Sequence, residues 1–165
     1  MVELKYNILL VNMLLMIMKK LPSFDLHLIN GKILKSSKIK NKTILFFYPK
    51  ALTPGCTIEV SEFQNSLLKF KKLNFDIIGC SKDSIEKNLK FSEKYNLKYM
   101  LASDLTDVCE KLNIWIEKSM YGKKYFGIDR STFIIDSKRN IFKQWNKVKV
   151  KDHVEEVLLH AKNCT

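Results

Sequence analysis

The sequence predicts a single mixed α/β domain in which helices flank a mixed β-sheet. A chain of 165 residues fits one domain and is long enough to bury a substantial core. Its hydrophobic content of 46% and its charged content of 28% are ordinary for a globular protein. Strand-like and helix-like segments alternate in the middle of the chain, hairpins stand at both ends, and no repeat or linker divides it.

The first elements are a hairpin and a buried strand. Apolar and polar residues alternate over residues 24–28, and Asn30-Gly31 forms a two-residue turn before a returning strand at 33–34. Residues 43–48 (TILFFY) are a continuous apolar run, which is typical of a strand covered on both faces. The run stops at Pro49.

A helix and a second buried strand follow. Residues 76–80 form the strand, and the helix before it begins near Cys56. Apolar residues recur at helical spacing through that helix, at Val60, Phe63, Leu67 and Phe70.

Two further helices are predicted before the last strands. The first is opened by Ser84, a good N-cap, and ends near Tyr95, with Ile85 and Leu89 facing inward. The second opens near Asp104. Its inward face is marked by Leu105, Cys109 and Leu112.

The chain ends with a hairpin and a helix. Residues 132–135 and 141–145 read as strands separated by a turn around Lys138. The final helix is amphipathic, with an apolar face formed by Val154, Val157, Leu158 and Ala161.

The net charge of +12 does not by itself indicate a nucleic-acid site. Among the 29 basic residues only Arg130 and Arg139 are arginines, and the lysines are scattered along the chain. Nucleic-acid sites usually group their basic residues, with arginine forks or interleaved aromatic side chains. We therefore interpret the lysines as a solvated surface and expect no nucleic-acid partner.

Residues 1–18 are predicted to be an apolar N-terminal extension, and residues 19–165 the folded domain. The apolar run from Ile8 to Met18 is too short to span a bilayer as a helix, so we expect no stable membrane insertion. It resembles the core of a signal peptide, but no small-residue cleavage site follows. A dispensable extension is the first interpretation, ahead of a membrane-touching helix and a cleaved signal.

Cysteine usage points to a reactive thiol in a reducing compartment. The four cysteines form no CxxC pair, and the three histidines do not stand at zinc-ligand spacing beside them, so we expect no metal. Cys80 and Cys109 are predicted to be core residues, and Cys164, next to the last residue, to be mobile. These features favour a cytoplasmic location.

Cys56 is the candidate nucleophile. It follows a buried strand, two prolines and a glycine, at the start of a helix where free N–H groups and the helix dipole favour an anion. A free cysteine is only about 3% thiolate at pH 7, so ionisation alone gains about 30-fold. Further donors are needed, and Thr53 and Arg130 are placed to supply a hydroxyl and a bidentate fork.

At these residues the chain resembles the peroxiredoxins, most closely the bacterioferritin comigratory protein subfamily. The resemblance rests on Pro49, Thr53 and Cys56 within TPGCT, on Ser103-Asp104 and on the stretches 115–123 and 127–136, and covers about residues 20–160. It implies a thioredoxin-like fold and a thiol peroxidase that reduces hydrogen peroxide and organic hydroperoxides.

The resemblance also assigns roles to the residues. Cys56 becomes the peroxidatic residue, Pro49 shields it from water, Thr53 bonds the thiolate and the peroxide, and Arg130 orients both. The product would be a Cys56 sulfenic acid. No metal, flavin or haem is implied, and the reductant would be thioredoxin, a glutaredoxin or a small thiol. We expect a monomer or a weak homodimer.

The chain departs from the subfamily where many members carry a resolving cysteine. Those positions hold Ser61 and Ser92, and serine cannot form a disulfide. The chain therefore either works with one cysteine or uses another partner for Cys56, for which Cys164 is a weak candidate.

Two other functions compete with the peroxidase. A thiol–disulfide oxidoreductase normally needs the CxxC pair that this chain lacks. A non-enzymatic, basic thioredoxin-fold binding or holdase module would treat Cys56 as incidental.

Overall fold

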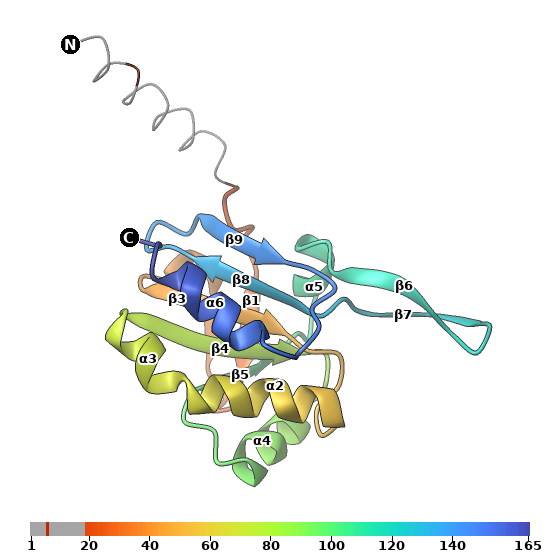
Figure 1. Ribbon diagram of the computed structural model, residues 1–165. Coiled ribbons are helices and arrows are strands. Elements are labelled where there is room, and N and C mark those ends of the chain that lie inside the picture. Colours follow the sequence, from red (N-terminus) through yellow and green to blue (C-terminus); the bar gives the residue numbers. More distant parts are fainter. Residues whose placement is uncertain (1–5, 7–18) are drawn as a thin grey trace.

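The computed structural model describes residue 6 and residues 19–165, and Figure 1 shows a sheet with helices packed on it. The predicted extension, residues 1–18, lies outside the described residues except for Tyr6. No helix within the described ranges is both long and apolar enough to cross a membrane. The main sheet has seven strands, in the order β2 (Ile33–Lys35), β1 (Asp25–Leu28), β5 (Met100–Ser103), β4 (Phe75–Ser81), β3 (Lys42–Phe47), β8 (Ser131–Ile135) and β9 (Ile141–Trp145).

The sheet is mixed, as expected. β3, β4 and β5 are parallel, whereas β8 runs antiparallel to β3, β9 to β8, β1 to β5 and β2 to β1. Together with the helices this is a thioredoxin-like fold, which confirms the predicted fold class.

β3 is an interior strand, between β4 and β8, and is buried on both faces because its side chains alternate between two apolar clusters. Ile44 and Phe46 enter one cluster, and Leu45 and Phe47 enter the other. The first cluster is covered by α2 (Pro54–Asn65), α3 (Leu67–Lys72), α4 (Ile85–Lys94) and α6 (His153–Ala161), the second by α5 (Val108–Lys111), and η1 (Ser36–Lys38) follows β2.

A second, two-stranded sheet projects from the body of the molecule (Figure 1). It is a hairpin of β6 (Trp115–Met120) and β7 (Lys123–Ile128). Its turn is Tyr121-Gly122, and both residues have positive φ (51° and 76°), which matches the two-residue turns whose twist suits a hairpin. Neither this hairpin nor β5 was predicted, because β5 has only four residues and the hairpin lacks a buried apolar face.

The other predicted strands and the final helix are confirmed, with differences in detail. The helix that starts near Cys56 ends at Asn65, and α3 continues the apolar face after Ser66. The predicted inward position of Leu105 is wrong, because it is exposed and precedes the short α5, although Cys109 and Leu112 are buried.

The predicted inward face of α4 is also wrong at Leu89, which is 38% exposed. The residues of α4 that are buried are Asn88, Phe91 and Ser92. Ser84 does cap the helix, and its side chain accepts a hydrogen bond from the backbone N–H of Lys87. Asn88 is polar and yet faces the sheet, because Ala102 and Ser103 of β5 form hydrogen bonds with its side-chain amide.

Asn88 is the centre of a buried polar network. Its Oδ1 accepts from the hydroxyl of Tyr48, and its Nδ2 donates to the carbonyl of Ala102 (3.2 Å) and to the hydroxyls of Ser103 (2.9 Å) and Ser81 (3.1 Å). A buried amide that satisfies this many groups fixes one orientation of α4 on the sheet.

We predict that Asn88→Ala lowers the free energy of unfolding by about 3 kcal/mol, because the buried hydroxyls of Tyr48 and Ser103 lose the amide that they bond. Urea unfolding at pH 7 measures the change. Leu89→Ala on the same helix is the matched control and should cost less than about 1 kcal/mol. Equal losses in the two variants would contradict the prediction.

Candidate active site

Cys56 lies in the first turn of α2, where the loop after β3 enters the helix. Thr53 is the N-cap residue in an extended conformation, and Pro54 is the first helical residue, where its missing N–H is not needed. The first backbone bond of this turn runs from the N–H of Thr57 to the carbonyl of Thr53 (2.9 Å). The N–H groups of Gly55 and Cys56 therefore precede the helical ladder and form the positive end of the helix.

Arg130 reaches Cys56 because of the register between β3 and β8. Phe47, the last residue of β3, pairs with Ser131, the first residue of β8. The residue before Ser131 therefore lies beside the loop that follows Phe47. Arg130 Nη2 lies 3.4 Å from Cys56 Sγ, and its side chain is only 16% exposed.

Arg130 also holds a buried carboxylate. Its Nη1 lies 2.5 Å from Oε2 of Glu59, a residue that is completely buried. Among the described residues, Oε1 of Glu59 has no hydrogen-bond partner. Burial raises the pKa of Glu59 to about 7, although Arg130 acts in the opposite direction.

Glu59 was missed from the sequence. It follows Cys56 by three residues and precedes Val60 and Phe63, and positions at these spacings share one face of a helix. A glutamate among the buried positions of an apolar face was the available signal, because a buried charge requires a partner.

A pocket of about 460 Å³ opens at Cys56. It brings together all four site residues predicted from the sequence, Pro49, Thr53, Cys56 and Arg130. Three lysines and an aromatic wall complete it. The remaining lining residues are Lys50, Lys82, Asp83, Trp115, Lys118, Met120, Tyr125, Phe126, Gly127 and Ile128. The fold therefore assembles this site from the loop after β3, the loop after β4 and the β6–β7 hairpin.

The aromatic side chains of the hairpin differ in their exposure. Tyr121 at the turn is 98% exposed. Trp115 stacks on Phe126 with ring centroids 6.4 Å apart, and Nζ of Lys82 lies 4.8 Å from the centroid of the Trp115 ring. Trp115 is thus partly buried: it packs against the second apolar cluster and also lines the pocket.

The hydroxyl of Thr53 donates to the carbonyl of Lys50 at 2.7 Å. In the described part of the chain no hydrogen bond joins Thr53 to Cys56. The loop itself is held by Asp83, which accepts from the N–H of Ala51 at 2.7 Å. Thr53 therefore lines the same pocket as Cys56, while its hydroxyl forms a hydrogen bond within the loop, to Lys50.

The other cysteines lie away from the pocket. Cys80 and Cys109 are fully buried, as predicted, and burial raises the pKa of both thiols well above the ordinary value. The prediction that Cys164 is mobile is wrong. It is 3% exposed in the core, and its carbonyl accepts from Nζ of Lys42 at 3.1 Å.

The position of Cys164 separates it from Cys56. The segment after α6 folds back onto the sheet beside Lys42, the first residue of β3, whereas Cys56 follows the other end of that strand. A strand of this length spans about 20 Å, far beyond the reach of a disulfide.

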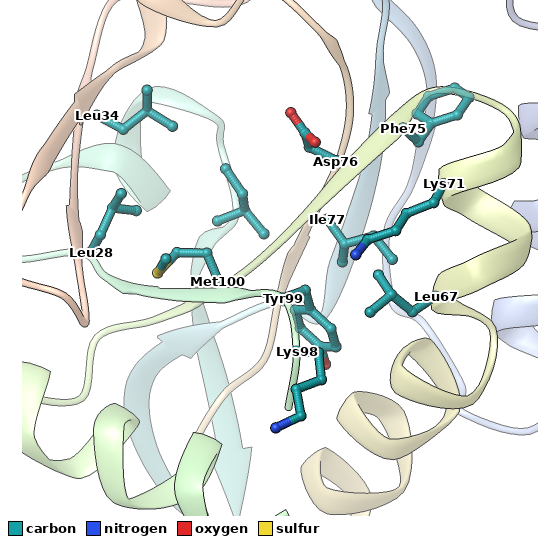
Figure 2. Close-up of a pocket in the computed structure, with 11 residues that line it drawn as sticks. Leu28, Leu34, Leu67, Lys71, Phe75, Asp76, Ile77, Lys98, Tyr99 and Met100 are labelled. Atoms are coloured by element: carbon teal, nitrogen blue, oxygen red, sulfur yellow. The ribbon is translucent and has the colours of Figure 1, made fainter. Parts of the chain in front are cut away.

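A second pocket, of about 370 Å³, lies at the opposite part of the sheet and is shown in Figure 2. It contains no cysteine and no arginine, so it offers no nucleophile for peroxide chemistry. Its lining residues are Leu28, Leu34, Leu67, Lys71, Phe75, Asp76, Ile77, Ile78, Lys98, Tyr99 and Met100.

Comparison with known proteins identifies the family. The AhpC/TSA family matches residues 17–144. The chain belongs to this family. Peroxiredoxin Bcp of Bacillus subtilis is 45% identical over 149 residues, which cover 89% of this chain and 95% of the relative. Peroxiredoxin Bcp of Escherichia coli K12 is 37% identical over 139 residues, or 83% of this chain and 89% of that protein.

Solved structures of AhpC/TSA family members agree with this assignment. Peroxiredoxin Q of Xanthomonas campestris superposes with a TM-score of 0.80 at 34% identity, covering 85% of this chain and 90% of that one. The bacterioferritin comigratory protein of the same organism, studied for its alkyl peroxide reduction activity, also gives a TM-score of 0.80. The chain is therefore a peroxiredoxin, a thiol peroxidase, which decides against the non-enzymatic alternative.

We predict that Glu59→Gln gains stability relative to the wild type as the pH rises. The carboxyl of Glu59 titrates near 4.5 when unfolded, and burial raises its pKa to about 7 when folded. Its contribution to stability is therefore fully present below pH 4.5 and is lost as the pH rises through 7. Above pH 7 the variant should gain about 3 kcal/mol relative to its value at low pH.

Urea unfolding at a series of pH values measures this difference. Glu93→Gln, on the exposed surface of α4, is the control and should show almost no such change. A stability difference for Glu59→Gln that stays constant from pH 4.5 to pH 8 would contradict the prediction.

Proposed function

We propose that Cys56 is the peroxidatic residue of this thiol peroxidase. The observation that supports it is the contact of 3.4 Å between Arg130 Nη2 and Cys56 Sγ, in the first turn of α2 and at an open pocket. The thiolate attacks the terminal oxygen of the hydroperoxide, an S–O bond forms and the O–O bond breaks. The sulfur becomes a sulfenic acid, and the other oxygen leaves and takes a proton to give an alcohol or water.

The same geometry supports roles for three neighbours. Arg130 offers its second nitrogen to the thiolate and to the peroxide, while Glu59 holds its first nitrogen in place. The hydroxyl of Thr53 can turn from Lys50 toward the sulfur once the thiol is ionised. Pro49 covers the pocket side of Cys56 with an apolar ring and keeps water out.

The substrates we propose are hydrogen peroxide and organic hydroperoxides. The side chains of Trp115, Met120 and Phe126 form an apolar wall of the pocket, and the last two are more than half exposed. An alkyl group attached to the reacting oxygens would bury part of this wall. The alkyl peroxide reduction studied in the Xanthomonas campestris relative is consistent with this assignment.

We further propose that the cycle uses one cysteine of the chain. Ser61 and Ser92 cannot form a disulfide, and Cys164 lies at the other end of β3. The sulfenic acid would then be reduced by thioredoxin, a glutaredoxin or a small thiol. All the site residues lie between Pro49 and Arg130, so residues 1–18 are proposed to be dispensable for peroxide reduction. The cytoplasmic location and the monomer or weak homodimer stay predictions.

We predict that one equivalent of hydrogen peroxide produces a trapped sulfenic acid on the wild type and not on Cys56→Ser. Intact-mass spectrometry with and without a sulfenic-acid trap measures the adduct, and Cys109→Ser is the matched control because its thiol is buried. A loss of two hydrogens without an adduct would replace the one-cysteine cycle by an internal disulfide. If the wild type and Cys56→Ser react equally and slowly, Cys56 is not the peroxidatic residue.

We predict that Arg130→Lys slows the reaction with peroxide by about 100-fold, because lysine keeps the charge but cannot hold Glu59 and the sulfur with separate nitrogens. Stopped-flow measurement of Cys56 oxidation gives the rate constant. Arg139→Lys is the control, since Arg139 lies in the β8–β9 turn and bonds the carbonyl of Ser37. A rate for Arg130→Lys within threefold of the wild type would contradict the proposed role.

A further inference from the structure

The proposed reaction leaves one proton unassigned. When the thiolate of Cys56 takes the terminal oxygen, the rest of the peroxide departs as an alkoxide or hydroxide, which is a strong base and needs a proton at that moment. Arg130 is effectively always protonated and does not release its proton. The hydroxyl proton of Thr53 is donated to the carbonyl of Lys50, or to the sulfur once the thiol is ionised, so neither state leaves it for the departing oxygen. Another group of the pocket therefore has to supply the proton that the departing oxygen needs.

Several titratable groups in the pocket already have partners. Lys82 is held by the carboxylates of Asp104 (3.2 Å) and Glu110 (3.0 Å). Asp83 accepts from the N–H of Ala51 and forms an ion pair with Lys87 at 2.7 Å. Lys50 and Tyr125 also line the pocket, but both are exposed and no described hydrogen bond fixes their polar ends. Lys118 is the described lysine of the hairpin wall whose ammonium is held in place and keeps free donor capacity.

The side chain of Lys118 is fixed so that its ammonium group lies at the pocket. Lys118 comes from β6, and its Nζ donates to the carbonyl of Ile128, two residues before Arg130. Its stem crosses Gly127: a Cβ placed at Gly127 would lie 3.4 Å from Cδ of Lys118. The ammonium has three N–H donors and spends one on Ile128, so two are left for a ligand. No carboxylate of the described chain forms an ion pair with it.

The charges around Lys118 suit a proton donor. Burial lowers its pKa and Arg130 lowers it further, while the charges of Asp129 and of the Cys56 thiolate raise it. The thiolate charge disappears when the sulfur is oxidised. Lys118 therefore becomes more acidic in the same step in which the leaving oxygen becomes basic.

We propose that Lys118 is the general acid that protonates the leaving oxygen, an inference that rests on the proposed function of Cys56. The sulfur of the thiolate bonds to the terminal oxygen, which keeps its hydrogen, and becomes a sulfenic acid. The O–O bond breaks, its electron pair stays on the departing oxygen, and that oxygen takes a proton from Nζ of Lys118. Sulfur is oxidised by two electrons and the peroxide is reduced by two. The neutral amine of Lys118 then regains a proton from water.

The test compares peroxides whose leaving groups differ in their need for a proton. Stopped-flow fluorescence of Trp115, which lines the pocket, follows Cys56 oxidation in a single turnover with hydrogen peroxide, cumene hydroperoxide and peracetic acid. Acetate leaves peracetic acid without a proton at pH 7, so that substrate does not need a general acid. In Lys118→Gln the rate constants with hydrogen peroxide and cumene hydroperoxide should fall by about 100-fold. The rate constant with peracetic acid should fall by less than threefold.

Two further variants separate proton donation from charge. Lys118→Arg keeps the positive charge without a transferable proton, and it should stay slow with hydrogen peroxide and cumene hydroperoxide. Lys124→Gln removes an exposed hairpin lysine that pairs with Glu117, and it should keep the wild-type rates with all three peroxides. Full recovery in Lys118→Arg, or an equal loss with all three peroxides in Lys118→Gln, would overturn the proposal.

If the proposed role of Cys56 is itself wrong, the same measurements give a different result. If Cys56 is not the peroxidatic residue, the wild type itself shows no fast phase that Cys56→Ser removes, with any of the three peroxides. If Cys56 reacts fast and Lys118→Gln matches the wild type throughout, only the assignment of Lys118 fails.

Discussion

The guanidinium of Arg130 lies between two groups that can both carry a negative charge. Its Nη1 meets Glu59 and its Nη2 meets the sulfur of Cys56. Burial raises the pKa of Glu59, and the charge of Arg130 opposes that rise. Arg130 thereby joins a buried residue of α2 to Cys56, the proposed nucleophile, through two different nitrogens of one guanidinium.

The arrangement depends on backbone pairing at the centre of the sheet. β3 and β8 place Arg130 beside the loop that carries Thr53 and Cys56. That loop is tied at Ala51 to Asp83, and Asp83 accepts from the hydroxyl of Ser81, which also bonds Asn88. The orientation of α4, fixed by Asn88, and the conformation of the active-site loop therefore belong to one polar network.

Four candidate site residues were predicted from the sequence: Cys56, Thr53 and Arg130 from local signals, and Pro49 from the family resemblance. Cys56 follows a proline and a glycine at a helix start, and Arg130 stands out in a chain that otherwise uses lysine. Glu59 has only a weak signal, its place on an apolar helix face, and Lys118 has none, since the proposed roles of both depend on what the fold places against them. Cys164 was misjudged for the same reason: its closeness to the chain end said nothing of the core cluster into which the last residues fold. Leu89 was misjudged because hydrophobic periodicity cannot anticipate a buried amide network.

The β6–β7 hairpin is the part of the pocket with the least support from the core. A two-stranded hairpin is marginally stable alone, and most of its side chains are exposed. Its base is held by the stacking of Trp115 on Phe126, by the contact of Lys82 with Trp115 and by the bond from Lys118 to Ile128. Cys56, the proposed nucleophile, and Arg130 are thus held by the main sheet, while the apolar wall proposed to meet the substrate belongs to a separate two-stranded sheet. In the proposed reaction, the main sheet therefore positions the reacting sulfur, and the body of the hydroperoxide contacts the hairpin.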